Sequence, residues 1–600
     1  MNIKIVGDNN YLGDLKEEFF KNRGIDNYMD FIKLKGFEQT DPFAFKNMKE
    51  AVRIITEKSG LNVGIVYDSD VDGVASGTIL YNYLSTYCDH NLKISIHRKK
   101  THGINMEELH EDGIIGWADV LIVPDAGSSD FAQHDGLLNG YNIRTIVLDH
   151  HQCDLGYSET ATVVNNQLDN ISTDLTGSAM CYKFTQALDI VLDECGADDF
   201  LDLVAIGLIG DMANVKDYEV QSLIRSGIKS FNNEFIKTVI KNDFNIKSDG
   251  LTSTTLAFSI IPMINACTRV AEFDEMKFII DAMGNVGTDR VFEYTFQRGK
   301  NKGKTIEENI YEYAHRVASK CRARQNRNVE KVLLGSKRPL KQGILSKMEE
   351  VNLVTDDTKI IVLDISDYEE VAGLSGLLAN KIMYSFNKPT LVLSNVNGGY
   401  AGSGRGEQIS FLRKRLEESN LVKSALGHEP AFGVKLLKDA TIEDISTSLN
   451  EYFKDEDTEA QYVVDFNIPY DELEDYLIED LANLEEFFGN GLKAPIVYTN
   501  EIIVEVSSIE TGKNGNLLKF VHNDIEFVKF KLKASDVEKL VPWQDKVCYN
   551  IVSQPSINIF KGKRTVQLVI KDIELVPLDD EQIEKTEDID WSNKDEEFEW

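Results

Sequence analysis

The amino-acid sequence predicts an α/β protein with a parallel-sheet domain, a second α/β domain joined to it by a long helix, and a small C-terminal β-barrel. Three observations lead to this prediction. Short apolar runs alternate with helical stretches from about residue 51 to 215, as in βαβ units. A helical pattern rich in Lys and Arg follows near residues 301–340. Residues 496–576 alternate apolar and polar side chains, with hairpin signals at 513–516 and 561–564, which is typical of an OB-like barrel.

The length of 600 residues and the apolar fraction of 42% allow several domains with packed cores. The patterns divide the chain into a leader (1–50), a first α/β domain (51–300), a basic bridging helix (301–340), a second α/β domain (341–455), a connector (456–495), the OB-like domain (496–577) and an acidic tail (578–600). The tail composition predicts disorder. Such a tail solvates the protein, docks on a basic partner or covers a basic groove of the protein itself.

Composition narrows the classes of partner and compartment. The formal net charge of −35 repels phosphate, although bound divalent cations and a locally basic groove reverse the sign where they lie. No apolar run approaches the roughly 20 residues of a membrane helix, and no signal-peptide core follows Met1. The seven cysteines are scattered without a C-x-x-C pair, so neither a disulfide framework nor a zinc site is predicted. We therefore expect a cytoplasmic protein without membrane contacts.

The most informative stretch is 62–80, where an apolar strand pattern ends in three alternating carboxylates and then enters a helix of small residues. Asp68, Asp70 and Asp72 follow the predicted strand, and functional groups of parallel sheets collect at the carboxyl ends of strands. A solvated acidic turn would suffice to explain a lone D-x-D pattern. An EF-hand calcium loop is disfavoured, because its twelfth position is Ile79 rather than Glu.

Three further apolar runs, predicted as strands, also end in Asp or in Asp-His-His. They are 120–124 before Asp125, 145–148 before Asp149, His150 and His151, and 203–210 before Asp211. Four independent surface turns explain this repetition poorly, so we expect the strands to bring these side chains together. Carboxylates brought together repel each other and are costly to bury unless they are paired or coordinated. Oxygen ligands with one or two imidazoles suit Mn²⁺ or Mg²⁺, so the sequence predicts a site for a pair of divalent cations.

The order of these motifs, D-x-D-x-D-G, D-x-G-x-S, D-H-H and a late Asp, resembles the DHH phosphoesterase superfamily, and more closely its RecJ branch of single-strand-specific exonucleases. The resemblance implies two metal ions, Mn²⁺ or Mg²⁺, whose ligands are Asp70, Asp72, Asp125, His150 and Asp211. Asp125 would be the bridging ligand. The resemblance also implies that His151 contacts the scissile phosphate, while Asp149 orients the adjoining imidazoles.

The chain departs from the superfamily pattern at Val66. Several members place a metal-binding His at this position, four residues before the middle Asp of the first motif. Asp68 or a water molecule must then complete that metal site.

Other segments that resemble RecJ proteins supply candidate phosphate-binding residues. Residues 41–43 resemble the D-P-F lead-in of the family, although a turn that caps a helix explains them equally well. Residues 262–269 are similar to the segment P-R-I-N-A-A-G-R, with Met263 in place of its first Arg, which implies that Arg269 faces a substrate phosphate. Arg98 lies in a basic loop, 95–103, that either holds a phosphate backbone near the metals or is simply solvated.

The second α/β domain resembles the DHHA1 domain of the superfamily, through the segments 371–382, 402–406 and 427–433. The candidate phosphate-binding residues there are Lys381, Ser403, Arg405 and His428. Glycines beside Ser403 and Arg405 expose backbone N–H groups, and the guanidinium fork suits phosphate. A tight hairpin explains the G-S-G-R pattern taken alone. The G-G-H of the family reads Leu426-Gly427-His428 here.

Two basic regions complete the candidate contacts with nucleic acid. Cations between 298 and 341 either line a channel for a DNA strand or solvate an exposed linker helix. The stretch 558–573 resembles the end of the RecJ OB domain, and its candidate contacts with a single strand are Phe560, Lys561, Lys563 and Arg564. An ordinary barrel hairpin explains these four residues as well.

These features predict a metal-dependent exonuclease that hydrolyses single-stranded DNA by a two-metal mechanism. The resemblance implies 5′ to 3′ polarity and a role in DNA repair, recombination or replication. The expected partners are single-stranded DNA and a single-strand-binding protein or helicase, and we expect a monomer. Two alternatives remain: a DHH phosphodiesterase that acts on short oligonucleotides or cyclic dinucleotides, and a non-catalytic RecJ-like scaffold that binds DNA.

Overall fold

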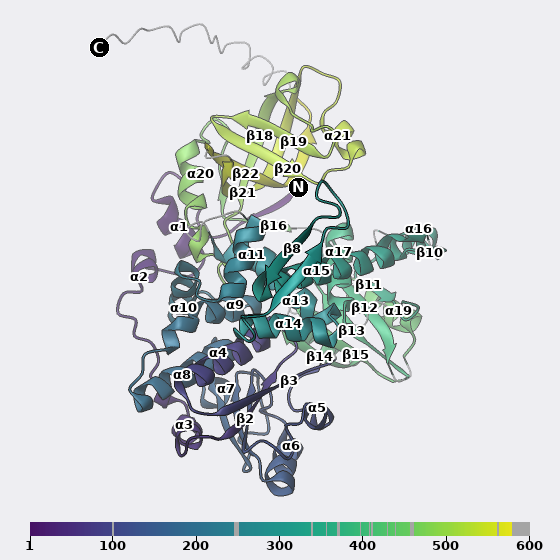
Figure 1. Ribbon diagram of the computed structural model, residues 1–600. Helices are drawn as coiled ribbons and strands as arrows, with labels where there is room; N and C mark the ends of the chain where they lie inside the picture. The colour runs from purple at the N-terminus through teal and green to yellow at the C-terminus, as the bar shows by residue number, and fades with distance from the viewer. Residues whose placement is uncertain are drawn as a thin grey trace, which may run out of the picture. The chain divides into compact units, whose positions relative to one another are not determined.

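The computed structural model divides into two compact units (Figure 1). The larger unit comprises residues 36–460 and 489–491, and the smaller unit comprises residues 1–35, 461–488 and 492 onward. Residues 1–35, predicted as part of a separate leader, therefore belong with the C-terminal part of the chain. The structure describes residues 1–98, 101–244, 251–337, 340–355, 357–368, 373–396, 398–406, 409, 412–428, 430–438, 440–455, 461–560 and 563–578. The predicted acidic tail lies, from residue 579 on, outside the described residues.

The first lobe of the larger unit contains the predicted parallel sheet. Its strand order is β3-β2-β4-β5-β6, and all neighbouring strands pair in parallel. The strands are β2 (Asn62–Tyr67), β3 (Asn91–Ile96), β4 (Val120–Pro124), β5 (Arg144–Asp149) and β6 (Ala161–Asn165). Because the strands are parallel, their carboxyl ends meet at one edge of the sheet.

Helices cover both faces of this sheet. The helices α4 (Val71–Tyr87) and α8 (Gly177–Leu192) pack on one face, and α5 (Met106–Glu111) packs on the other. Gly77 lets α4 approach β2 closely, because a Cβ there would lie 2.9 Å from the Tyr67 ring. Further helices of this lobe are α3 (Met48–Thr56), α6 (Phe131–Asp135), α7 (Asn166–Asp169), α10 (Tyr218–Lys229), α11 (Glu234–Phe244), α12 (Ser253–Thr255), α13 (Ile261–Val270) and α14 (Phe273–Met283).

The apolar run 203–210 is part of a helix, so the strand predicted there is wrong. Helix α9 (Leu201–Gly210) packs against α4, α8 and α10. All residues from Leu203 to Leu208 are buried, so the segment is apolar on every side. It therefore lacks the periodicity that distinguishes an amphipathic helix from a buried strand. Asp211 consequently enters the site from the C-terminal cap of a helix.

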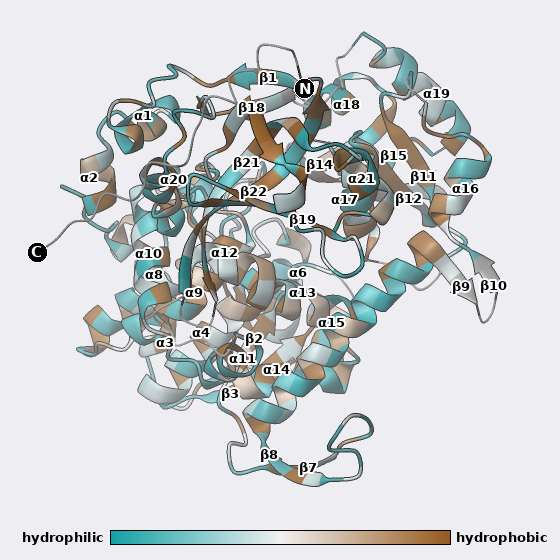
Figure 2. Ribbon diagram, turned by 90° about the horizontal axis from the view of Figure 1, so that it is seen from above, coloured by the Kyte–Doolittle hydropathy of each residue, from teal (hydrophilic) through white to brown (hydrophobic). Residues whose placement is uncertain are grey.

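A long helix, α15 (Ile310–Leu334), joins the two lobes of the larger unit. It packs against α13 and α14 of the first lobe and against α16 (Ile344–Glu350) and α17 (Ser375–Phe386) of the second. Figure 2 shows hydrophilic and hydrophobic turns alternating along it, with a hairpin at its N-terminal end. This hairpin, β7 (Val291–Thr295) and β8 (Thr305–Asn309), contains the first residues of the range 301–340 that was predicted to be helical.

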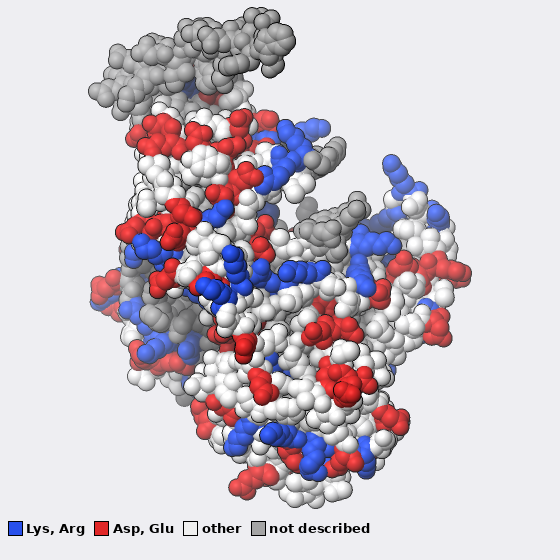
Figure 3. All heavy atoms as spheres, turned by 90° about the vertical axis from the view of Figure 1, so that its left-hand side faces the viewer, with Lys and Arg blue, Asp and Glu red and all other residues white. Residues whose placement is uncertain are grey.

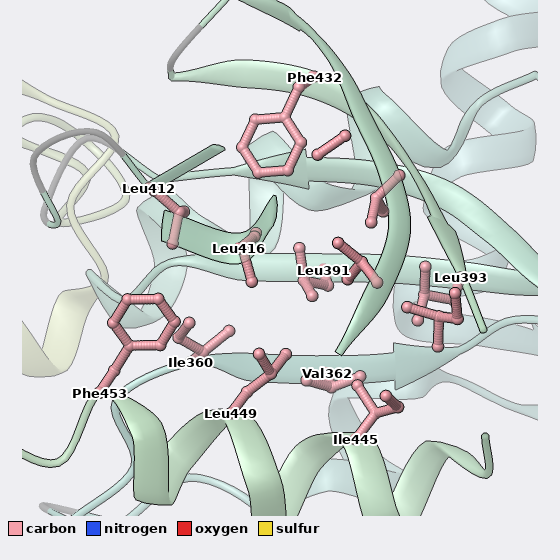
Figure 4. Close-up of a cluster of buried hydrophobic side chains, with 14 of the residues drawn as sticks. Ile360, Val362, Leu391, Leu393, Leu412, Leu416, Phe432, Ile445, Leu449 and Phe453 are labelled. Carbon is pink, nitrogen blue, oxygen red and sulfur yellow. The ribbon is translucent and has the colours of Figure 1, made fainter. Parts of the chain in front are cut away.

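The second lobe contains a five-stranded mixed sheet with the order β11-β12-β13-β15-β14. Its core draws side chains from β11, β12, α18 and α19, which converge in Figure 4. Leu391 of β12 and Leu449 of α19 are both fully buried there. The remaining elements are β9 (Gly335–Lys337), β10 (Leu340–Gln342), β11 (Ile361–Asp364), β12 (Thr390–Val396), β13 (Gly399–Arg405), α18 (Leu412–Glu418), β14 (Val422–His428), β15 (Ala431–Leu436) and α19 (Ile442–Tyr452).

The smaller unit contains the OB-like fold, as a six-stranded sheet with the order β17-β18-β21-β22-β20-β19. Its two longest strands form an antiparallel pair with a register shift at Val552 and Ser553. Strand β1 (Asn2–Ile5) pairs in parallel with β16 (Gln461–Val464), which ties the first residues of the chain to this unit. The other elements are β17 (Phe466–Asn467), β18 (Val497–Glu505), β19 (Leu517–His522), β20 (Ile525–Phe530), β21 (Lys546–Phe560), β22 (Lys563–Val576), α1 (Leu15–Asn22), α2 (Tyr28–Lys33), α20 (Asp475–Ala482) and α21 (Ala534–Leu540).

The surface carries charges of both signs despite the net charge of −35. On the face drawn in Figure 3, Lys and Arg side chains form small groups among Asp and Glu side chains. Within the described ranges, no helix is both long enough and apolar enough to cross a membrane.

The core in Figure 4 gives a direct test of the second lobe. We expect Leu449→Ala to lower the free energy of unfolding by about 2–5 kcal/mol, because the side chain is fully buried and its removal leaves a cavity. Leu437→Ala is the matched control, since this side chain is 47% exposed, and we expect a change within about 0.5 kcal/mol. Urea denaturation followed by circular dichroism measures both. Equal losses would contradict the packing of α19.

Candidate functional site

Acidic side chains collect at the carboxyl edge of the parallel sheet, as the sequence predicts. Asp68 follows β2 directly, Asp125 follows β4, and Asp149 is the last residue of β5. The amide of Asp125 donates to the Leu148 carbonyl at 2.8 Å, so the pairing of β4 with β5 extends to the site. Asp125 has a φ of +62°, which is uncommon for a non-glycine residue and turns the chain sharply away from the strand.

The N-terminus of α4 supplies the next two carboxylates. The side chain of Asp70 caps the helix by accepting hydrogen bonds from the amides of Asp72 (3.0 Å) and Gly73 (3.1 Å). Asp72 Oδ1 accepts hydrogen bonds from Thr176 Oγ1 and from the amide of Ser178, both at 3.1 Å. Its other oxygen, Oδ2, is buried and has no hydrogen-bond partner among the described residues. One oxygen of Asp72 is therefore held in place while the other is left for a ligand.

Two groups of side chains in this cluster have the spacing of metal ligands. One consists of Asp68, Asp70 and Asp125, and the other of Asp125, His150 and His151, with potential ligand atoms within 4.8 Å of one another in each group. Asp125 belongs to both groups. His150 Nε2 lies 3.1 Å from Asp125 Oδ1 and 3.7 Å from Asp211 Oδ2. Carboxylate and imidazole donors in this arrangement fit Mn²⁺ or Mg²⁺.

The electrostatics of the cluster favour cation binding. Burial raises the pKa of Asp125 well above its usual value, and the charges of Asp72 and Asp70 raise it further. Burial, together with repulsion from Asp72 and Asp70, raises the pKa of Asp211 to about 8. The protein alone therefore does not stabilise all of these carboxylates in their charged form, and cations between them would remove that penalty.

Asp149 differs from its neighbours, because it lies among hydrogen-bond donors rather than carboxylates. It accepts hydrogen bonds from the amides of Ser128 (3.0 Å) and His150 (2.7 Å) and contacts His151 Nδ1 at 2.8 Å. Although burial opposes ionisation, these contacts lower the pKa of Asp149 below its usual value. Burial lowers the pKa of His151, but the hydrogen bond and the charge of Asp149 outweigh it and raise the pKa to about 9. The geometry is that of a carboxylate that orients an imidazole.

Sequence analysis missed two histidines that contact Asp68. His102 Nδ1 lies 2.6 Å from Asp68 Oδ2, and His97 Nε2 lies 3.6 Å from Asp68 Oδ1. His97 is held from its other side by Glu108, whose Oε2 lies 2.6 Å from His97 Nδ1. Both histidines belong to the segment after β3 that the sequence marks only as basic. Their spacing, H-x₄-H without a carboxylate, is not a recognisable ligand motif in the sequence.

Two glycines that the sequence analysis did not single out also shape the site. A Cβ at Gly177, the first residue of α8, would lie 2.3 Å from Asp125 Oδ1. A Cβ at Gly207 in α9 would lie 2.1 Å from Asp72 Oδ1. Both helices can therefore approach the carboxylates only because these positions lack a side chain.

A cavity of about 130 Å³ adjoins the carboxylates. It is lined by Ser69, Asp70, Val71, Asp72, Gly210, Asp211, Asn265 and Arg269. The segment predicted to bind a substrate phosphate, now identified as helix α13, thus delivers Asn265 and Arg269 to the acidic cluster. Burial lowers the pKa of Arg269, while the charge of Asp70 opposes this change.

Arg405 of β13, in the second lobe, lies close to Arg269. Burial lowers the pKa of Arg405, and the positive charge of Arg269 lowers it further. Arg405 Nε is buried and has no hydrogen-bond partner among the described residues, while Nη1 donates to the Gly404 carbonyl at 2.7 Å. Two guanidinium groups near each other repel, and a bound anion would relieve that repulsion.

The structure shows no contact between the acidic cluster and the other candidate residues of the larger unit that it describes. Arg98 forms ion pairs with Glu111 (2.8 Å) and Asp112 (2.6 Å), so its guanidinium is already engaged. Ser403 Oγ lies 2.9 Å from Ser375 Oγ at the start of α17, and Lys381 is exposed on the same helix. The side chain of His428 lies outside the described part of the structure.

In the smaller unit, Lys563 is exposed, while Arg564 forms an ion pair with Glu479 at 2.5 Å. Lys561 and the side chain of Phe560 lie outside the described residues. The contacts predicted for this hairpin with a single strand therefore stay a prediction.

Comparison with known protein families identifies two regions of the chain. Residues 62–208 match the N-terminal domain of the DHH family, and residues 464–572 match the RecJ OB domain. The chain is 31% identical over 596 residues to an SPbeta prophage-derived protein of Bacillus subtilis (strain 168) that is provisionally named a single-strand DNA-specific exonuclease. The match covers 96% of this chain and 98% of that protein, and Bacillus phage SPbeta has a relative with the same figures.

The fold is similar to that of RecJ from Thermus thermophilus. The crystal structure of that protein with Mn²⁺ has a TM-score of 0.69 and 17% sequence identity, and the match covers 94% of this chain and 76% of that one. The structure of the same protein with Mg²⁺ has a TM-score of 0.64 and 16% identity, covering 94% and 75%.

The repulsion within the acidic cluster predicts the behaviour of Asp125→Asn. Without divalent cations, we expect this variant to melt about 2–4 °C higher than the wild type, because folding no longer requires the buried Asp125 carboxyl either to take up a proton or to carry its charge beside Asp72 and Asp70. We also expect added Mn²⁺ to raise the melting temperature of the wild type and not that of the variant. Differential scanning fluorimetry with EDTA and then with Mn²⁺ measures both effects.

Glu159→Gln removes an exposed carboxylate and is the control, for which we expect the melting behaviour of the wild type. An Asp125→Asn protein that melts lower in EDTA and is still stabilised by Mn²⁺ would show that the cluster is not a cation site.

Proposed function

Because this chain belongs to the RecJ-type family of DHH exonucleases, we propose that it hydrolyses phosphodiester bonds of single-stranded DNA with two divalent cations, Mn²⁺ or Mg²⁺. The proposed ligands are Asp70, Asp72, Asp125, His150 and Asp211, with Asp68 beside them. The observation that carries the proposal is the acidic cluster around Asp125 with a partly buried arginine pair next to it. Cations and the phosphate of a DNA strand are the two ligands that together neutralise this arrangement.

The residues of the chain have separate roles in this reaction. When bound, two divalent cations lower the pKa of a water molecule and stabilise the charge that develops on the phosphate and the leaving oxygen. Asp125 is shared between the two ligand groups. Asp149 holds Nδ1 of His151, so its other nitrogen is directed away from Asp149. With Nδ1 held by Asp149, Nε2 of His151 can donate a hydrogen bond to the scissile phosphate.

Arg269 and Arg405 come from different lobes and are proposed to hold a phosphate of the substrate. Each guanidinium is partly buried, and the charge of Arg269 lowers the pKa of Arg405. A phosphate between them would turn this repulsion into two attractions. Because one arginine lies in each lobe, a bound strand would also fix the second lobe against the acidic cluster.

The direction of digestion and the cellular role are carried over from the resemblance. We propose 5′ to 3′ polarity and a function in DNA repair, recombination or replication, with a single-strand-binding protein or helicase as a partner. The OB-like unit gives a reason to favour a long strand over a dinucleotide, because a small diester requires no additional nucleic-acid-binding domain.

A digestion assay tests the reaction. We expect single-stranded DNA labelled at its 5′ end to release a short labelled product in Mn²⁺ or Mg²⁺, and to remain intact in EDTA. Asp125→Ala should reduce the rate by several orders of magnitude, while Glu159→Ala, an exposed carboxylate, should not. Duplex DNA and a dinucleotide are digested in parallel. DNA that is bound but never cut would support the scaffold alternative, and preferred cleavage of the dinucleotide would support the phosphodiesterase alternative.

The arginine pair predicts a separation of binding from chemistry. We expect Arg405→Lys to raise KM for a single-stranded oligonucleotide about tenfold, because a lysine keeps the charge and loses the two-pronged contact. The value of kcat should change much less. Arg413→Lys, on α18 of the same lobe, replaces an arginine that pairs with Glu417 at 3.4 Å and serves as the control. Steady-state kinetics measure both constants, and an unchanged KM for Arg405→Lys would remove this residue from the substrate site.

A further inference from the structure

A hairpin that precedes α15 forms a separate feature of the larger unit (Figure 2). Backbone hydrogen bonds extend the pairing of β7 and β8 to its end, from Phe296 N to the Lys304 carbonyl (3.0 Å) and from Gly303 N to the Phe296 carbonyl (2.7 Å). A turn closes it, with Lys302 N donating to the Gly299 carbonyl at 3.2 Å. Gly299 and Gly303 both have positive φ, which this turn requires. The hairpin is therefore an ordered element about 20 Å long.

The hairpin tip, residues 297–304, carries an unusual concentration of positive charge. Its eight residues are Gln297, Arg298, Gly299, Lys300, Asn301, Lys302, Gly303 and Lys304, with no acidic and no apolar side chain among them. All are exposed, and the four cations form no ion pair or side-chain hydrogen bond with any described residue. The chain has a net charge of −35, so four cations at alternate positions without acidic partners indicate a site for a negatively charged ligand.

Three arginines of α15 differ from the cations of the tip, because they are engaged within the protein. Arg316 pairs with Glu308 at 2.6 Å, and Arg324 pairs with Glu275 at 2.9 Å. Arg322 donates to the carbonyls of Phe258 and Ser259. In the tip, by contrast, all four cations lack such a partner among the described residues.

The stem of the hairpin holds the tip firmly and takes no part in the positive surface. The guanidinium of Arg316 lies 4.1 Å from the centre of the Tyr294 ring, and Phe296 packs edge-on against Tyr294 at 5.1 Å. Glu293 and Glu307 face each other across the two strands. The aromatic rings therefore anchor the stem to α15, and the positive charge begins only beyond them.

We propose that the hairpin tip binds the sugar–phosphate backbone of duplex DNA that flanks the single strand being digested. Surfaces for single strands combine cations with aromatic side chains on which bases stack, and the tip has no aromatic side chain. Duplex DNA presents its phosphates outward at high density and keeps its bases stacked inside, so cations alone suffice to bind it. The proposal rests on the proposed function, since it assigns the digested strand a duplex neighbour.

The test compares DNA ligands in EDTA, where nothing is digested. The variant replaces Arg298, Lys300, Lys302 and Lys304 with Gln. Its matched control replaces four exposed lysines elsewhere in the larger unit, Lys49, Lys58, Lys229 and Lys438, with Gln, so that both proteins lose the same charge. Fluorescence anisotropy gives the affinity for a tailed duplex and for the single strand alone, over a series of salt concentrations.

We expect the hairpin variant to bind the tailed duplex about tenfold more weakly than the control variant does. The magnitude of the slope of log K against log salt should fall by about 3.6, since each of the four lost duplex phosphate contacts removes about 0.9. Affinity for the single strand should change less than about twofold. Unchanged melting temperatures would show that both variants fold, as expected for exposed side chains.

Three outcomes would overturn the proposal. Equal affinity and equal salt slope for the variant and the control would show that the tip does not contact duplex DNA. An equal loss for the single strand and the tailed duplex would assign the tip to the single strand instead. A third arm uses a synthetic acidic peptide with the sequence of residues 579–600, and loss of peptide binding without loss of duplex binding would assign the tip to a protein ligand. Failure of the proposed function is distinguishable, because it would appear in the digestion assay and not in these EDTA measurements.

Discussion

Five carboxylates converge in the first lobe, and their mutual repulsion is the constraint on which the surrounding structure depends. They belong to Asp68, Asp70, Asp72, Asp125 and Asp211. A parallel sheet can bring such groups together because its strands end at one edge, and the turn with positive φ at Asp125 directs that side chain into the cluster. Helices α8 and α9 approach so closely that Gly177 and Gly207 cannot carry a side chain. Hydrogen bonds to Asp70 and Asp72 fix the carboxylates without neutralising them all. The fold thus keeps several carboxylates close together, and a bound cation would neutralise their charge.

The arginine pair is a group of uncompensated positive charge beside this negative cluster. Arg269 lines the same cavity as Asp70 and Asp211, while Arg405 is contributed by the second lobe. The two guanidinium groups do not stabilise each other, because like charges repel, as they do among the carboxylates. A phosphodiester is negatively charged and has two non-bridging oxygens. One of them can contact the arginines while the other faces the cation site. Substrate binding would therefore stabilise the arrangement of both lobes, and α15, which packs against elements of each, is the element that sets their spacing.

The sequence predicted the parts of the site that depend on a short, continuous stretch of residues. The strands before Asp68, Asp125 and Asp149 are short apolar runs that end in a charged residue, and both the sheet and its acidic edge were predicted correctly. The run before Asp211 is equally apolar and is a helix, because burial on all sides removes the periodicity on which the distinction depends. His97, His102, Gly177 and Gly207 were missed for another reason. Their roles arise from contacts across the fold, and neither an isolated His nor an isolated Gly carries a local signature.

The range of electrostatic forces explains how so acidic a protein can serve as a nuclease. At physiological ionic strength the Debye length is about 8 Å, so exposed acidic side chains farther than this from a phosphate repel it little. The buried arginine pair is screened much less, because it is partly shielded from solvent ions. The hairpin tip is exposed but has no acidic residue within its eight positions, so a phosphate at the tip meets positive charge only. Affinity then follows the local arrangement of charges rather than the net charge.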